Sequence, residues 1–361
     1  MDGVNDGLCP KSKARNVLPP QPAEVINLSS ILVPWLFLYC MACGPSDYGG
    51  IAAATDCTRK SAGSNAPDAG CQDALSTSLL ALLPDDSAHP NPIVTKPEPA
   101  SPADKSGFTL LNPTPRLLMR NFNTDRPDVT ESPYTVDAGH FQAEFSFAEY
   151  TYDHGYGERT NGFSVLPVNL KLGLLNNLDL QFVLNPYQNI LTRGPSLSYR
   201  NSGLGDAELR AKLNLRGNDG GKAAFGVMTF VRFPTGSDRL SDHHVEGGLI
   251  LPLAMQELPG RFDLGTMAEF DLDRNDRNDG YGVDFVHSAT IGHELFTEKL
   301  NCYVEYVGIA PMRTSRTYLV YFDTGVTHAL SKDMQLDAGI TVGLSRRADD
   351  LTVFAGLSFR R

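Results

Sequence analysis

From Phe141 to the C-terminus, hydrophobic and polar residues alternate along the chain with a period of two. In "GDAELRAKLNLR" (205–216), every second residue from Ala207 onward is alanine or leucine, and charged or amide side chains stand between them. Successive side chains of a β-strand point to opposite faces, so this pattern predicts strands with one apolar and one polar face. The alternation recurs in about a dozen segments bounded by Gly, Asn, Asp, Pro or Ser.

The length and number of these segments favour an all-β fold, an antiparallel up-and-down transmembrane β-barrel of about 12 strands. A tilted strand needs about 9–11 residues to cross a bilayer, whereas strands of soluble proteins average about 5–6 residues. Some connections are near-minimal, such as Asn176-Asn177, and others are long and polar, such as "HGYGERTNG" (154–162) and "DRNDRNDGYG" (273–282). Short turns at one end and long loops at the other are typical of outer-membrane barrels.

A soluble β-sandwich is the alternative fold, because its strands also alternate between a core face and a solvent face. The distribution of tyrosine favours the barrel, since aromatic residues of membrane barrels form girdles near the strand ends. Tyrosines gather near the ends of the predicted strands, at Tyr150, Tyr152, Tyr156, Tyr303, Tyr306, Tyr318 and Tyr321.

Composition excludes several classes of protein. The formal net charge is −11 and no basic stripe is visible, which argues against a nucleic-acid partner. No run of about 18 apolar residues occurs, so no membrane-spanning helix is predicted. Five of the six cysteines lie within the first 71 residues, so the long C-terminal part is not a disulfide framework.

The chain divides into three regions of different composition. In residues 1–54, basic residues precede the apolar run "ILVPWLFLYC" (31–40) and small residues follow it, as in a secretory signal peptide; lipid attachment at Cys43 is the alternative. Residues 55–121 are rich in Ser, Ala, Asp and Pro, and we expect a low-complexity, mostly disordered linker. Residues 122–361 are expected to form the barrel.

A polar segment with several short acids precedes the first predicted strand. Its motif consists of Thr124, Asp125, Arg126, Pro127 and Asp128. We expect this motif to act as a lid or plug that folds into the lumen, where Arg126 would bind carboxylates bidentately. The alternative is a solvated periplasmic turn stiffened by prolines.

The polar faces of the strands are predicted to line the lumen. The residues concerned are Glu144, Lys171, Asp179, Gln181, Asp206, Glu208, Arg210, Lys212, Arg232, Glu269, Asp271, Asp284, Glu305, Asp323 and Asp337. Acids outnumber bases in this set, so a water-filled pore would favour cations or neutral solutes over anions. Alternatively, acids and bases pair across the wall and fill a narrow barrel.

Histidine-containing motifs do not predict an enzyme. His243 and His244 are adjacent, so on a strand they would point to opposite faces and would not chelate one ion. His287 and Ser288 are separated in the same way, and no Ser-His-acid set is suggested by spacing. We predict no catalytic residue, no metal site and no cofactor.

Three stretches are informative in combination: "NTDRPDVTESPYTVDAGHFQAEFSFAEYTYD" (123–153), "GLGDAELRAKLNL" (203–215) and "FVRFPTGS" (230–237). With them, the chain from about Phe122 onward resembles the outer-membrane transporter family labelled MetA-pathway of phenol degradation. One departure is the C-terminus, where Arg360-Arg361 follow Phe359, whereas family members tend to finish on an aromatic residue or one residue after it.

The resemblance implies a passive transporter in the bacterial outer membrane for small, phenol-like molecules. Its expected partners are outer-membrane lipid and a small-molecule solute. The alternative is a structural or adhesive outer-membrane barrel that has a filled interior and transports nothing.

Overall fold

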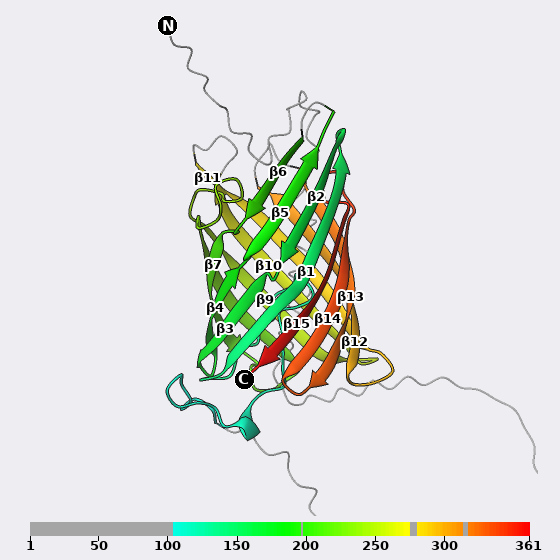
Figure 1. The fold of residues 1–361 in the computed structure, drawn as a ribbon. Helices are drawn as coiled ribbons and strands as arrows, with labels where there is room; N and C mark the ends of the chain where they lie inside the picture. Colours follow the sequence, from blue (N-terminus) through cyan, green and yellow to red (C-terminus); the bar gives the residue numbers. More distant parts are fainter. Residues whose placement is uncertain (1–103, 196–197, 275–279, 313–316) are drawn as a thin grey trace, which may run out of the picture. The chain divides into compact units, whose positions relative to one another are not determined.

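A computed structural model describes residues 104–195, 198–274, 280–312 and 317–361. The predicted signal-like segment 1–54 and residues 55–103 of the predicted linker 55–121 lie outside these residues. The described chain contains one short 3-10 helix, η1 (Arg116–Leu118), and a single antiparallel sheet (Figure 1). Its strands are β1 (Phe141–Gly155), β2 (Glu158–Val165), β3 (Val168–Leu175), β4 (Leu178–Leu184), β5 (Tyr187–Arg193), β6 (Ser198–Gly203), β7 (Ala207–Arg216), β8 (Ala223–Phe233), β9 (Glu246–Leu258), β10 (Phe262–Arg274), β11 (Tyr281–Glu294), β12 (Leu300–Pro311), β13 (Leu319–Ser331), β14 (Met334–Gly343) and β15 (Leu351–Arg360).

Three pairs of these strands are halves of longer ones, so the fifteen described strands make twelve crossings. β2 and β3 are separated by Leu166-Pro167, and β4 and β5 by Asn185-Pro186. Proline has no amide hydrogen for the ladder, which explains the interruption at both places. β6 and β7 are separated by residues 204–206, opposite the break between β4 and β5. The prediction of about twelve strands is confirmed.

The barrel closes where the first strand meets the last. β1 pairs with β15 from Gln142↔Arg360 to Tyr152↔Leu351. Phe141 and Arg361 complete this seam with two backbone hydrogen bonds of 3.0 and 2.8 Å. The two arginines that follow Phe359 therefore take part in closure of the sheet.

The outer face of the barrel is apolar and most of the inner face is polar, the reverse of a soluble protein. The exception inside is a buried apolar cluster on β8 to β12, formed by Met228, Phe230, Ile250, Met267, Val286 and Val307. On β7, Lys212 is 0% exposed, while its outward neighbours Leu209 and Leu213 are 45% and 37% exposed. Large apolar side chains are exposed around the whole sheet, and charged side chains are buried inside it. This arrangement requires hydrocarbon outside, and it excludes the sandwich, whose apolar faces pack on each other.

A charged substitution on the outer face should be costly only at membrane depth. Val304→Arg in the middle of β12 is expected to lower the free energy of unfolding by about 2–4 kcal/mol, measured by urea unfolding in lipid vesicles. Val245→Arg, in the loop before β9, is the matched control, because Val304 and Val245 are 46% and 48% exposed. Equal losses at both positions would contradict a lipid-facing outer surface.

The connections differ in length between the two ends of the barrel. The end that carries the C-terminus has short turns such as Asn176-Asn177, and the opposite end has the twelve-residue loop 234–245 (Figure 1). The long loop expected at 154–162 is wrong, because β1 and β2 are joined by Tyr156-Gly157 alone, both with positive φ, as in tight hairpins. Polar residues there continue the strands, since strand ends beyond the hydrocarbon need no apolar face. No helix within the described ranges is long and apolar enough to cross a membrane.

Candidate functional site: a plug inside the barrel

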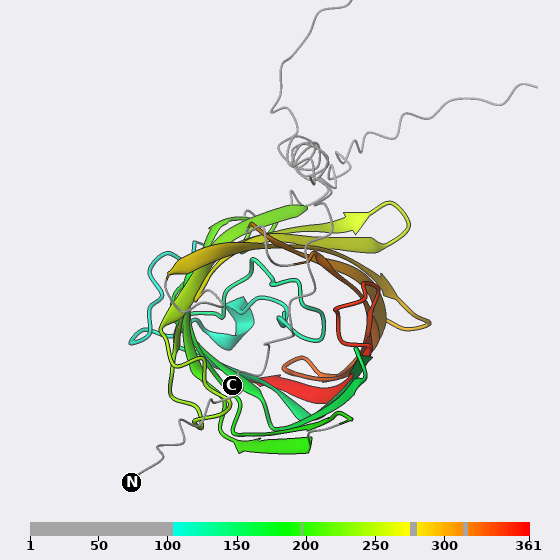
Figure 2. The same ribbon diagram turned by 90° about the horizontal axis from the view of Figure 1, so that it is seen from above.

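The segment before β1 lies inside the ring of strands. Residues 121–137, which we call the plug segment, form irregular backbone within the lumen (Figure 2). Irregular backbone cannot satisfy its own amides and carbonyls, so these groups need partners on the wall. The barrel wall supplies them, as the following contacts describe.

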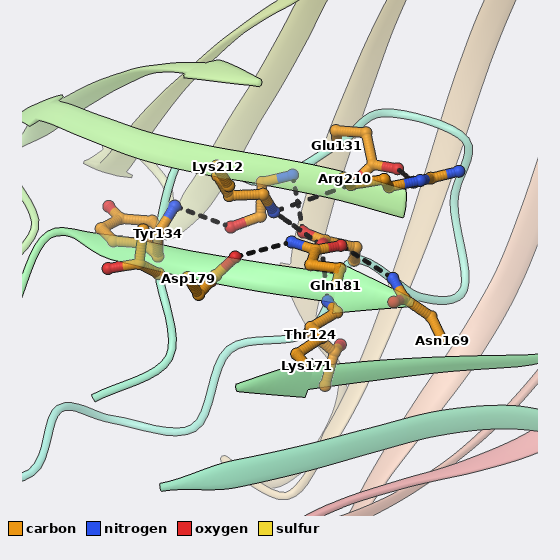
Figure 3. A network of polar contacts seen from close by, with 12 residues as sticks. Thr124, Glu131, Tyr134, Asn169, Lys171, Asp179, Gln181, Arg210 and Lys212 are labelled. Carbon is orange, nitrogen blue, oxygen red and sulfur yellow. Dashed lines mark hydrogen bonds and ion pairs between the residues drawn. The ribbon is translucent and has the colours of Figure 1, made fainter. Parts of the chain in front are cut away.

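Asp125 is held by two lysines of the wall. Its carboxylate lies 2.5 Å from the ammonium of Lys171 on β3 and 2.6 Å from that of Lys212 on β7, with all three side chains nearly inaccessible to solvent. It also accepts a hydrogen bond of 3.0 Å from the amide of Ser132. Burial acts to raise the pKa of Asp125, but the two ammonium groups hold this pKa well below its usual range. Figure 3 shows this side of the lumen.

Strand periodicity explains why the lysines reach the plug segment. Lys171 lies between Leu170 and Leu172, and Lys212 lies between Ala211 and Leu213. These neighbours face outward, so alternation directs both ammonium groups inward. Lys171 also forms an ion pair with Glu144 of β1. Each buried cation therefore has more than one carboxylate partner, as buried charges require.

Arg126 reaches the other side of the lumen. Its guanidinium donates to both carboxylate oxygens of Asp337 on β14, at 2.7 and 3.3 Å. It lies 3.9 Å from Glu149 and 5.6 Å from the ring centre of Phe354. The bidentate geometry is the one that favours arginine over lysine.

Glu131 pairs with Arg210 of β7, and one of its carboxylate oxygens lies 3.7 Å from Lys212. Burial and the neighbouring Asp125 raise the pKa of Glu131 to about 7, in spite of the Arg210 guanidinium. Burial and the carboxylate of Glu305 likewise raise the pKa of Asp128 well above its usual range. Docking of the plug segment therefore disfavours the ionised form of these two carboxyl groups.

The wall also binds the backbone of the plug segment. Glu305 on β12 accepts hydrogen bonds of 2.8 Å from the amides of Val129 and Thr130, and one of 2.5 Å from the Thr130 hydroxyl. Asp179 on β4 accepts one of 2.9 Å from the amide of Val136. These partnerships satisfy both the irregular backbone and the buried carboxylates.

A second network fixes the base of the plug segment at the C-terminal end of the barrel. Arg360 lies 3.3 Å from Asp137 and 2.8 Å from Asp333. Arg120 donates at 3.0 Å to Asp219, which also binds Lys105 at 2.7 Å. Sequence reasoning missed this network. The departure at Arg360-Arg361 was the available signal, because a charged residue at the end of a barrel strand needs a partner.

The fifteen residues predicted to line the lumen divide by burial. Ten are buried: Glu144, Lys171, Asp179, Gln181, Glu208, Lys212, Asp284, Glu305, Asp323 and Asp337. Five are partly exposed: Asp206, Arg210, Arg232, Glu269 and Asp271. Seven of the fifteen are bonded to each other or to the plug segment through contacts given above.

Asp206 binds the backbone of loop 234–245 rather than the plug segment. Its carboxylate accepts hydrogen bonds from the amides of Gly236 at 2.7 Å and Asp242 at 2.9 Å. Thr235 completes the junction by accepting from the amide of Ala207 at 2.9 Å. Two motifs that are separate in sequence, Gly-Asp and Pro-Thr-Gly, therefore bind each other and position loop 234–245.

His287 and His243, which the sequence singled out, lie in separate parts of the structure. His287 stacks against Phe285 and Tyr318 and bonds the Tyr318 hydroxyl at 3.0 Å, while Ser288 contacts Thr130 on the opposite face of β11. His243 lies in loop 234–245, 3.9 Å from Asp238. No group of three His, Cys, Asp or Glu side chains suited to a metal ion occurs in the part of the chain that the structure describes.

Comparison with known proteins gave a family and several solved structures. The family model described as "Putative MetA-pathway of phenol degradation" matches residues 124–360. The COG4313 outer membrane channel from Pseudomonas putida F1 has 12% identity and a TM-score of 0.49, covering 66% of this chain and 100% of the other. The CymD monoaromatic hydrocarbon channel has 9% identity and a TM-score of 0.35, with 62% and 87% covered. The NanC porin has 7% identity and a TM-score of 0.39, with 61% and 98% covered. No curated protein matches the chain.

Proposed function

Because the chain belongs to the family described by the phenol-degradation MetA-pathway, we propose that it is a passive channel of the bacterial outer membrane for small, phenol-like molecules. The lumen-lining residues provide its polar wall, and the plug segment, with the Thr124–Asp128 motif at its centre, controls passage. No catalysis and no cofactor are part of this function.

The observation that carries the proposal is the way in which the plug segment is held. Its contacts with the wall given above are ion pairs, hydrogen bonds and the approach of Arg126 to the Phe354 ring, and none is covalent. Such contacts exchange for water when the segment moves, so they can open and reform. A barrel built only as a scaffold has no need of a removable polar segment in its interior.

A non-transporting barrel is the second candidate, and one observation favours it. The plug segment and the charged wall residues together occupy a large part of the lumen, since Asp125, Lys171 and Lys212 are almost completely buried. Under this alternative the segment never leaves, and the buried network serves stability alone.

Conductance separates the two candidates. The purified full-length protein in planar bilayers is expected to show discrete current steps, and vesicles that contain it are expected to take up phenol faster than empty vesicles. Correct insertion is checked by migration on a gel with and without boiling. A correctly inserted barrel that gives neither conductance nor uptake would support the filled, non-transporting barrel.

The half of the lumen nearer loop 234–245 should select cations. Carboxylates occupy inward-facing positions on β9 to β11, at Glu246, Glu269, Asp271, Asp273 and Asp284. A lumen with excess negative charge concentrates cations. We expect the open channel to pass potassium in preference to chloride, as measured by reversal potential.

Neutralising two of these acids tests the assignment. Glu269→Gln combined with Asp271→Asn should bring the permeability ratio several-fold closer to unity. Asp238→Asn is the matched control, because Asp238 is 90% exposed in loop 234–245 and should leave the ratio unchanged. A preference for chloride in the unmodified protein would contradict this prediction.

A further inference from the structure

Three exposed arginines gather where β2, β5 and β6 lie side by side, at the end of the barrel opposite the C-terminus (Figure 1). Arg159 of β2 stands directly opposite Arg193 of β5. Arg200 of β6 stands opposite Leu191, two residues before Arg193 on β5. These three residues, which we call the arginine patch, therefore bring three guanidinium groups into one region of the sheet.

Strand alternation places the arginine patch on the outer face of the barrel. Phe163 of β2 and Tyr187 of β5 belong to the exposed outer surface, each being 44% exposed. Arg159 lies four residues before Phe163, and Arg193 lies six residues after Tyr187. Even spacings keep side chains on the same face of a strand, so both arginines point away from the lumen. Arg200 shares this face, because it stands opposite the outward-facing Leu191.

The arginine patch has no counter-charge of its own. Among the described residues, no acid forms an ion pair with Arg159, Arg193 or Arg200. Glu158 is adjacent to Arg159 in the chain, so its side chain is directed to the other face of β2. Residues directly opposite each other on neighbouring strands have Cβ atoms only about 4.5–5.5 Å apart, and like charges there are destabilising. An anion from outside the chain would remove this repulsion.

The depth of the arginine patch is that of lipid headgroups. The guanidinium of Arg159 lies 5.2 Å from the ring centre of Tyr152, and the Tyr150 hydroxyl donates at 2.8 Å to Asn161. Such tyrosines mark the membrane–water interface. Two residues of a strand tilted by about 40° rise by roughly 5 Å along the membrane normal, so Arg159 lies roughly 10 Å beyond Phe163. The headgroup layer of each leaflet is about 5–8 Å thick. The guanidinium groups therefore reach the layer that contains phosphate.

From this geometry we propose that the arginine patch binds the phosphate groups of lipid A, the phosphorylated glycolipid of the outer leaflet. Outer-membrane barrels carry short turns on the periplasmic side and long loops outside, which assigns the end with loop 234–245 to the outer leaflet. Guanidinium binds phosphate bidentately, and neighbouring guanidinium groups can share one phosphate. The site anchors the barrel to its lipid, and it does not depend on which solute the lumen passes.

Titration of the folded full-length protein in detergent micelles with lipid A, followed by native mass spectrometry, tests the proposal. The unmodified protein should bind lipid A at a lower concentration than lipid A from which the phosphates have been removed. Equal binding of the two lipids would overturn the site without recourse to any variant. Competition by inorganic phosphate at the same concentration as lipid A would show a site for free phosphate, and it would overturn the assignment to a lipid.

A triple variant locates the binding on the patch. Arg159→Gln, Arg193→Gln and Arg200→Gln combined should raise the half-saturating concentration of lipid A by about tenfold or more, the loss expected from even one charge-assisted hydrogen bond. Arg239→Gln, Arg346→Gln and Arg347→Gln combined are the matched control, because these exposed arginines lie in loops 234–245 and 344–350 at the same end. The control removes the same charge and should change that concentration by less than about twofold.

Migration on a gel with and without boiling checks that both triple variants are folded. Equal losses of lipid A binding in the two variants would show a general effect of charge and would overturn the patch. Full binding by the Arg159, Arg193 and Arg200 variant would overturn it as well. Conductance of this variant reports on the channel separately, since the arginine patch lies outside the lumen.

Discussion

Asp125→Ala is expected to convert a channel that is closed most of the time into one that is open most of the time. The substitution leaves the ammonium groups of Lys171 and Lys212 without their shared partner inside the docked barrel. Removing one member of a buried ion pair costs about 3–5 kcal/mol. Since about 1.4 kcal/mol is a factor of ten, the equilibrium between docked and released plug should shift at least a hundredfold toward release.

Open probability in single-channel recordings measures this shift. Glu144 and Glu131 remain near the two lysines, so the effect should fall toward the lower end of that range. Asp238→Ala at the exposed loop position is the control for the same chemical change. An Asp125→Ala protein that folds, inserts and keeps the open probability of the unmodified protein would show that the plug segment does not gate the lumen.

Raising the pH should release the plug segment. Glu131 and Asp128 both have raised pKa values when docked, so the docked state binds protons that the released state gives up. The stabilisation of the docked plug by these two groups is complete below their ordinary pKa values. It is lost as the pH rises through their pKa values in the docked state; the value for Glu131 is about 7. Asp125 has the opposite shift, but its docked pKa lies below the pH range in which this loss occurs.

The open probability should therefore rise between about pH 5 and pH 8, by at most about tenfold per pH unit for each proton released. Asp128 faces Glu305 and Asp323, both acids, so Asp128→Asn removes the repulsion and should keep the plug docked at alkaline pH. A channel whose open probability falls with rising pH, or an Asp128→Asn variant as pH-sensitive as the unmodified protein, would contradict this explanation.

The alternation of hydrophobic and polar residues predicted the barrel. The positions of Lys212 between Ala211 and Leu213 and of Glu305 between Val304 and Tyr306 define inward and outward faces without knowledge of the neighbouring strands, because strand geometry alone sets that period. Strand number followed from the same pattern. The hairpin at Tyr156-Gly157 could not be predicted from this pattern, because the alternation of hydrophobic and polar residues ends where a strand leaves the membrane.

The partners of the plug segment depend on register and closure. Asp125 is 46 residues from Lys171 and 87 from Lys212, and Arg126 is 211 from Asp337. The sequence by itself determined that charged side chains would face the lumen and that a polar segment would precede the first strand. Only the closed barrel decided which charges meet, because a pair across the lumen is set by the curvature and stagger of all twelve crossings together.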